Sequence, residues 1–183
     1  MPHDPDTCVF CEIVAGREPS SIVYRDEQVC AFMDIQPVNP GHLLVVPNAH
    51  AVYLADVESD VGARMFVVGQ RLAAAIRRSG VRCDGVNLFL ADGVAAGQEI
   101  FHAHLHVFPR FEGDGFGLRH PPHYSSLPNR ATLEDVANSV RNALTHIHVT
   151  KPVGQRGRPA SVGCAHAAGR RLACFVRRRT SPR

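Results

Sequence analysis

The sequence predicts an α+β fold, with an antiparallel sheet of about five strands, a long helix and a C-terminal helix. Two observations indicate this class. Short β-branched apolar runs, separated by Gly, Pro, Asn or Asp, recur along the chain as far as Pro109. Two longer stretches repeat their apolar residues at steps of three or four, the spacing of an amphipathic helix.

The strands are expected where apolar residues alternate with polar ones or form short runs. In chain order they are predicted at residues 22–24, 29–33, 42–46, 85–91 and 102–109. Pro37, Pro40 and Gly41 force a turn before the third strand. The Gly-containing loop 92–99 joins the last two strands.

The long helix is expected to begin near Val57 and to end at Gly80, with Asp56 or Ser59 as its N-cap. Its apolar face would consist of Val61, Met65, Val68, Leu72 and Ile76. The second helix is expected at 132–144, with Thr132 at its cap.

Length and charge divide the chain into a domain, residues 1–149, and a tail, residues 150–183. At 183 residues the chain suits one compact domain with some appended sequence. The segment 151–183 holds one Lys and eight Arg with no Asp or Glu, so residues 1–150 carry a net charge of −6. We expect the tail, rich in Gly, Pro and Arg, to be disordered, and any contact with nucleic acid to be made through it alone.

No apolar run approaches the roughly 20 residues of a membrane-spanning helix, and Met1–Thr7 is too polar for a signal peptide. We therefore expect a cytoplasmic protein that does not bind membranes. Its six cysteines are too sparse for a small disulfide scaffold, so we interpret them as reduced thiols or metal ligands.

Three histidines alternate with apolar residues from the start of the fifth predicted strand. His102, His104 and His106 would point to one face and Ala103, Leu105 and Val107 to the other. Imidazole suits either metal binding or the handling of an anion near neutral pH. The three histidines alone leave both possibilities open.

The stretch His102-Ala-His104-Leu-His106-Val-Phe108 resembles the His-x-His-x-His signature of the histidine-triad (HIT) family of nucleotide hydrolases and transferases. Other blocks resemble the family in the same order: Cys8-Val-Phe-Cys11, Ala31-Phe-Met-Asp34-Ile35, Pro40-Gly41-His42 through Pro47 to His50, Asn87, and Gly97-Gln98. The resemblance implies a HIT-like fold, a homodimer formed through the long helix and a strand edge, and a purine nucleotide as ligand.

The same resemblance assigns roles to single residues. His104 would be the nucleophile, while His42 and His106 would donate hydrogen bonds to phosphate oxygens. Asp34 would bind the ribose hydroxyls, with Ile35 against the base. The remaining nucleotide contacts would come from Asn87, Gly97, Gln98 and Glu99.

A structural zinc site is also implied, because zinc-containing bacterial members use a Cys pair with two histidines. The corresponding residues here are Cys8, Cys11, His50 and His102. Thiolates and imidazoles are ligands that Zn²⁺ prefers, and four of them leave no open coordination position.

The implied function is hydrolysis at the α-phosphate of purine nucleotide conjugates, either phosphoramidates or dinucleoside polyphosphates, through a nucleotidyl-histidine. Alternatives are a nucleotidyltransferase or phosphorylase, a non-catalytic nucleotide sensor or scaffold, and a metalloenzyme that uses all three triad histidines as ligands.

Two features leave the substrate open. Glu99 stands where phosphoramidase members of the family typically have Ser or Thr, so it either turns outward or serves a different leaving group. The loop 110–119 would either cover the site, with Arg110 or Arg119 as phosphate partners, or lie on the surface with solvated arginines.

Overall fold

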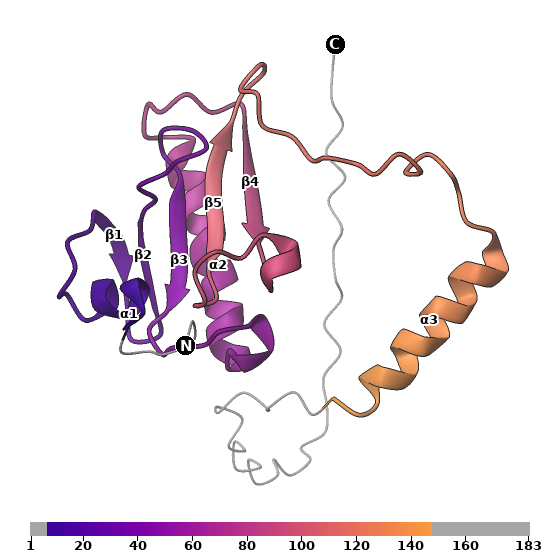
Figure 1. The fold of residues 1–183 in the computed structure, drawn as a ribbon. Coiled ribbons are helices and arrows are strands. Elements are labelled where there is room, and N and C mark those ends of the chain that lie inside the picture. Colours follow the sequence, from indigo (N-terminus) through magenta and orange to yellow (C-terminus); the bar gives the residue numbers. More distant parts are fainter. Residues whose placement is uncertain (1–6, 148–183) are drawn as a thin grey trace, which may run out of the picture. The chain divides into compact units, whose positions relative to one another are not determined.

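The computed structural model describes residues 7–147, which contain a five-stranded antiparallel sheet in the order β1-β2-β3-β5-β4 (Figure 1). The strands are β1 (Ile22–Arg25), β2 (Val29–Met33), β3 (Leu43–Pro47), β4 (Gly85–Leu90) and β5 (Leu105–Arg110). The helices are α1 (Val9–Val14), α2 (Ser59–Ile76) and α3 (Arg130–Leu144), and two short 3-10 turns are η2 (Leu54–Asp56) and η3 (Val94–Ala96). The predicted α+β class, with its long helix and C-terminal helix, is confirmed.

Strand β5 lies between β3 and β4 in the sheet, although β5 follows both of these strands in the sequence. Leu44 on β3 lies opposite His106, and Asn87 on β4 lies opposite Phe108. Residues of the turn before β3 and of β4 are therefore placed beside the third triad histidine.

Helix α2 covers one face of the sheet, behind the strands in Figure 1. The predicted apolar face is confirmed, since Met65, Val68, Leu72 and Ile76 are buried against core residues of β2, β3 and β5, with Val61 partly buried beside them. Gly69 permits the close approach, because a Cβ at this position would lie 2.9 Å from Leu105 Cδ2.

The predicted caps of α2 are wrong. The N-cap is Glu58, without a side-chain hydrogen bond, and the C-cap is Arg77. Asp56 is unable to cap α2 because it belongs to the preceding turn η2, where its carboxylate accepts a hydrogen bond from Tyr53 N at 3.0 Å. Turn formation by Asp competes here with helix capping.

Helix α1 lies on the opposite side of the sheet from the α2 core. Phe10 and Ile13 are buried in a second cluster with Phe32, Leu44 and Val46. This small cluster fixes the Cys8–Cys11 segment against β2 and β3.

Strand β5 begins at Leu105, three residues later than predicted. Ala103 N donates to Ala51 O at 2.7 Å, so the chain here bonds to the segment after β3 before it enters the sheet ladder. His102 and His104 precede the strand, and only His106 lies within it. The predicted separation of faces nevertheless holds for Leu105 and Val107, which belong to the α2 core.

Helix α3 begins two residues before the predicted start. Its N-cap is Asn129, whose side chain accepts a hydrogen bond from Thr132 N at 2.9 Å, so Thr132 is a donor to the cap rather than the cap itself. Within residues 7–147 no helix is long and apolar enough to cross a membrane. The predicted tail, residues 150–183, lies outside the described residues.

Candidate active site and metal cluster

His42 and His106 form a hydrogen-bonded pair at the centre of the site. His42 Nε2 lies 2.9 Å from His106 Nδ1, and the His104 ring follows at 4.8 Å from the His106 ring. His42 directly precedes β3 and follows Gly41, which has a φ of 98° and where a Cβ would lie 3.1 Å from Val81. The Pro40-Gly41 turn therefore places the His42 ring next to His106.

Hydrogen-bond partners determine the tautomers of this pair. Val38 N donates to His42 Nδ1 at 3.1 Å, so Nδ1 carries a lone pair and the His42 proton sits on Nε2. That proton is donated to His106 Nδ1. The proton of His106 then sits on its Nε2, where it can be donated to a ligand oxygen.

His104 has a different arrangement, because its Nδ1 donates to the main-chain carbonyl of His102 at 2.7 Å. The lone pair of the ring is then on Nε2, which is the atom required of a nucleophile. His104 is only 5% exposed and packs edge-on against Phe10, with 5.3 Å between ring centroids.

Burial keeps these imidazoles neutral. It lowers the pKa of His104 below 6.5 and that of His42 likewise, although the nearby Asp34 carboxylate opposes both shifts. Burial, together with the neighbouring His104 and His42, lowers the pKa of His106 to about 4. At neutral pH the site therefore offers N–H donors and a lone pair rather than imidazolium ions.

Asp34 lies at the edge of the histidine pair. Its Oδ2 is 3.5 Å from His42 Nδ1, and its Oδ1 accepts a hydrogen bond from Gln36 N. The adjacent Ile35 is 95% exposed, so its apolar side chain is accessible beside Asp34.

Asn87 is half-buried on β4, on the same side of the strand as Phe89, whose ring centroid is 5.8 Å from that of His106. Asn87 thus belongs to the histidine face of the sheet.

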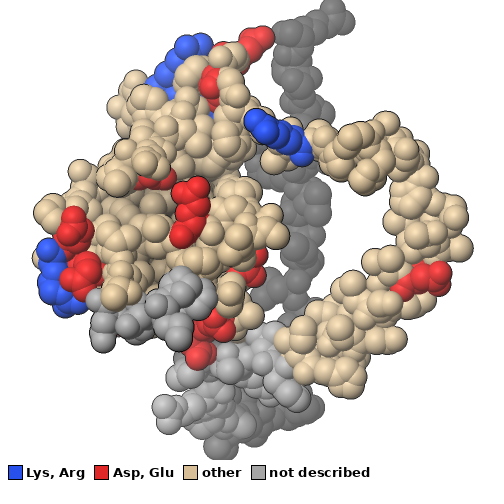
Figure 2. All heavy atoms as spheres, in the orientation of Figure 1, with Lys and Arg blue, Asp and Glu red and all other residues tan. Residues whose placement is uncertain are grey.

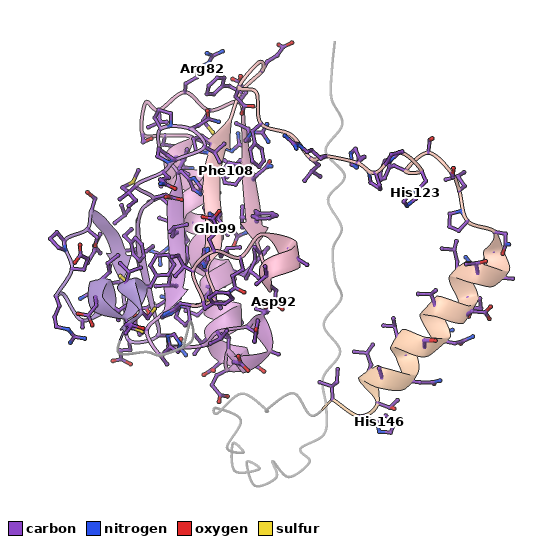
Figure 3. The ribbon with its side chains drawn as sticks, in the orientation of Figure 1. Arg82, Asp92, Glu99, Phe108, His123 and His146 are labelled. Carbon is purple, nitrogen blue, oxygen red and sulfur yellow. The ribbon has the colours of Figure 1, made fainter. Side chains whose placement is uncertain are left out.

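The loop 92–99 is held by its own polar groups. Gln98 is buried, its amide oxygen accepts from Gly93 N at 2.7 Å, and its amide nitrogen donates to Val52 O at 2.8 Å. The N–H groups of Gly97 and Gln98 also have acceptors within the loop. Glu99 is exposed, and Figure 3 shows it on the segment that leads into β5.

The four residues expected to bind metal form one cluster. Among the described residues, Cys8, Cys11, His50 and His102 each offer a ligand atom, and these atoms lie within 4.8 Å of one another. His102 Nε2 donates to Pro47 O at 3.0 Å, which turns its Nδ1 lone pair toward the thiols. Burial and the neighbouring Cys8 raise the pKa of Cys11 to about 12.

The spacing of the cluster fits a tetrahedral zinc ion. Ligand bonds of about 2.3 Å to sulfur and about 2.0 Å to nitrogen place the two ligand atoms about 3.5 Å apart. The sulfur–nitrogen distances are 3.4 Å for Cys8–His102, 3.3 Å for Cys11–His50 and 3.6 Å for Cys11–His102. The donor set and its spacing therefore both suit zinc.

Comparison with known proteins identifies the family. The family model described as HIT domain matches residues 15–113, more than half of the chain. The chain belongs to the HIT family.

Solved HIT structures resemble this one. A HIT family member from Bacillus subtilis is 36% identical, with a TM-score of 0.68 over 74% of this chain and 96% of its own. A Zn-bound histidine-triad protein from Mycobacterium smegmatis is 41% identical, with a TM-score of 0.59 over 74% of this chain and 99% of its own. Among curated relatives, an Arabidopsis thaliana protein named adenylylsulfatase HINT3 is 36% identical over 107 residues, 58% of this chain and 54% of its own.

In this HIT protein the triad histidines separate into two groups. Within the described residues, His102 clusters with Cys8, Cys11 and His50, while His106 lies with Asp34 and His42. The three triad histidines therefore do not form one ligand set, which removes the geometric basis for the metalloenzyme alternative.

Sequence reasoning missed two contributors to this site. Phe10 packs against both His102 and His104, and its place between two candidate metal ligands was the only available signal. Asp114 binds Arg110 through two hydrogen bonds, so Arg110 is engaged in an ion pair rather than free for a phosphate.

Proposed function

We propose that this protein hydrolyses purine nucleotide conjugates at the α-phosphate through a nucleotidyl-histidine intermediate. One observation carries the proposal: His104 is a buried, neutral imidazole whose Nδ1–H is occupied by a carbonyl, beside a His42–His106 pair that directs an N–H outward. A nucleophile and an oxyanion donor thus stand side by side.

In the first step the His104 Nε2 lone pair attacks the α-phosphorus. A nitrogen–phosphorus bond forms, and the bond from phosphorus to the leaving atom breaks. The leaving amine, pyrophosphate or nucleotide departs with the bonding electron pair and takes up a proton from solvent as its basicity requires. The His102 carbonyl stabilises the positive charge that develops on the imidazole by accepting its Nδ1–H.

The His42–His106 pair stabilises the charge on phosphorus. His106 donates its Nε2–H to a non-bridging phosphate oxygen, while His42 holds the His106 ring in that tautomer. Phosphoryl transfer depends mostly on positioning and electrostatic stabilisation, which is what the fixed, neutral Nε2–H donor of His106 supplies.

In the second step water attacks the same phosphorus. A phosphorus–oxygen bond forms, the bond to His104 breaks with its electron pair returning to Nε2, and the proton of the water leaves with the nucleoside monophosphate or to solvent. The enzyme is thereby restored to its starting state.

Recognition of the nucleotide would use the edge of the sheet next to the histidine pair. The Asp34 carboxylate suits a ribose diol, and the exposed Ile35 suits a purine ring. We assign Asn87 to the sugar or phosphate because it shares a face with Phe89. Gly97 and Gln98 shape the loop beside the phosphate, and Glu99 at its end disfavours an anionic leaving group.

We further propose that Cys8, Cys11, His50 and His102 hold a structural zinc ion, which when bound supplies a cross-link. Helix α1 and the residue that caps it contribute the two thiols, the segment after β3 contributes His50, and the segment before β5 contributes His102. These residues therefore hold α1 against the site.

A homodimer is the oligomeric state that we propose. An apolar hollow of about 320 Å³ is lined by residues of η2, α2, β4 and β5: Leu54, Gly62, Met65, Phe66, Leu88, Leu90 and Leu105. Phe66, which lines the hollow, is exposed, and β4 is an edge strand of the described sheet. Light scattering of the wild-type protein should give a molar mass of twice the chain mass. The Phe66→Glu variant should have the mass of a single chain.

The central experiment measures AMP release from adenosine 5′-phosphoramidates, ADP and diadenosine polyphosphates side by side. Wild-type protein should release AMP and, in quenched single-turnover reactions, carry labelled nucleotide on His104. Transfer of the nucleotide to an added phosphate or alcohol would favour a transferase or phosphorylase. Tight binding without release would instead favour the sensor function.

A further inference from the structure

A buried polar network links the loop after β5 to the turn that carries His42. Asn39 is 6% exposed, and its side-chain amide donates to Pro109 O at 2.9 Å and to Asp114 Oδ2 at 3.0 Å. The Asp114 side chain is 3% exposed, although the residue lies 75 positions along the chain from Asn39. Buried polar groups so distant in sequence are retained when they fix a geometry.

Asp114 is itself fixed by its surroundings. Arg110 binds it in a bidentate manner, at 2.8 Å to Oδ1 and 2.5 Å to Oδ2, and the N–H groups of Phe111 and Phe116 also donate to it. The Arg110 side chain lowers the pKa of this carboxyl below its usual range, so Asp114 is ionised at neutral pH.

Two routes lead from Asp114 to His42. Through hydrogen bonds, Asp114 holds Asn39, whose carbonyl accepts from His42 N at 3.1 Å. Through ring contacts, Phe116 packs edge-on against Phe108 at 5.2 Å, and Phe108 packs against the His42 ring at 4.9 Å. Hydrogen bonds through Asn39 therefore fix the backbone of the turn 38–42, and the Phe108 ring contact fixes the His42 ring.

The position of this turn decides between two states of the histidine pair. With Val38 N at 3.1 Å from His42 Nδ1, the His42 proton lies on Nε2. Asp34 Oδ2, 3.5 Å from the same Nδ1, favours the opposite tautomer, in which Nδ1–H donates to the carboxylate. His42 Nε2 would then accept from His106 Nδ1, and His106 Nε2 would present a lone pair to the phosphate instead of a proton.

We propose that Asn39 and Asp114 are positioning residues that hold Val38 N–H on His42 Nδ1, and so set the tautomers of His42 and His106 that the proposed phosphoryl chemistry requires. The inference rests on the proposed function for its catalytic consequence. Its structural consequence, the proton positions, is measurable in the protein without substrate.

The test compares Asp114→Asn and Asn39→Ala with Asp26→Asn in the full-length, zinc-loaded protein. Asp26 is a matched control because it too accepts from two backbone N–H groups and binds an arginine, Arg64, but lies away from the histidines. Long-range nitrogen–proton NMR of the ¹⁵N-histidine-labelled protein at neutral pH reports which ring nitrogen of each histidine is protonated. Backbone amide spectra verify that each variant is folded.

We expect wild type and Asp26→Asn to show protonated Nε2 on His42 and His106. Asp114→Asn and Asn39→Ala should shift His42 toward protonated Nδ1 and lower kcat by about 10- to 100-fold, with KM changed by less than about threefold. Folded variants that retain the wild-type tautomers, or a control that shifts as they do, would overturn the proposal. If wild type releases no AMP, the proposed function fails while the tautomer measurement still decides this inference.

Discussion

Removal of the metal cluster should release α1 while the rest of the domain stays folded. The perturbation is Cys11→Ser, which removes one thiolate from the cluster of four. Helix α1 has six residues, too few to be stable on its own in water. Its attachment therefore depends on what it buries and what it ligates.

The magnitude follows from the contacts of α1. Burial of Phe10 and Ile13 stabilises the docked helix by about 3 to 6 kcal/mol. Fixing the backbone of its six residues costs about 6 to 12 kcal/mol. Backbone hydrogen bonds at about 1 kcal/mol each offset most of the difference. Without metal, the free energy of docking α1 on the sheet is thus close to zero. A metal ion present at 1,000 times its dissociation constant would stabilise the docked state by about 4 kcal/mol.

The assay is hydrogen exchange of the peptide that spans residues 8–16, with zinc content measured on the same samples. Cys11→Ser and chelated wild type should both exchange rapidly in this peptide and retain protection in β3 and β5. Cys83→Ser is the matched control, since Cys83 donates to Gly85 O at 3.0 Å and a serine hydroxyl preserves that bond. Unchanged protection of α1 in zinc-free protein would refute the reasoning.

Three shorter predictions concern the nucleophile, a carboxylate and the core. His104→Ala should abolish AMP release while nucleotide affinity, measured by calorimetry, stays within about tenfold; wild-type turnover in this variant would contradict the nucleophile. Hydrogen bonds from Val29 N, Gln28 N and Arg64 outweigh burial and lower the pKa of Asp26 in the folded state, so its stabilisation is complete above an unfolded pKa of about 3.9 and is lost as the pH falls. Asp26→Asn should therefore unfold at less urea than wild type at pH 7, with the gap closing below about pH 4; a gap independent of pH would contradict this. Gly69→Val should destabilise the domain by about 1 to 3 kcal/mol in urea titrations, because its Cβ would lie 2.9 Å from Leu105 Cδ2; a variant as stable as wild type would show that the core yields there.

Local patterns in the sequence were sufficient to predict the strands and the apolar face of α2. Alternation and helical spacing are properties of neighbouring residues, and the core confirmed them at Met65 and Leu72. The boundaries were less predictable. Asp56 was assigned to a cap but serves a 3-10 turn, and the strand expected from His102 begins at Leu105 because Ala103 binds Ala51.

In the candidate site too, residues within a sequence motif were predictable and contacts between distant segments were not. The sequence motif indicated which histidines would gather, and the structure brings His42, His104 and His106 together. It gave no indication of Asn39 or Asp114, whose contact joins segments 75 residues apart. Contacts at such separation leave no periodic pattern in a single sequence.

The surface charge of the described residues agrees with the charge counted from the sequence. On the face seen in Figure 2, acidic side chains are more widespread than basic ones, in keeping with the net charge of −6 over residues 1–150. An acidic surface of this kind weakens long-range attraction of nucleic acid to the described part of the chain.

His102 makes two separate contacts. Its imidazole ring faces the thiols of the metal cluster, and its main-chain carbonyl accepts the hydrogen bond from His104 Nδ1. Every amino acid supplies a carbonyl, but only a few supply a metal ligand. A substitution of His102 that leaves the backbone in place would therefore remove the candidate metal ligand and keep the acceptor of the His104 proton. The first and second histidines of the motif are thus coupled through the backbone and not through the imidazole ring of the first.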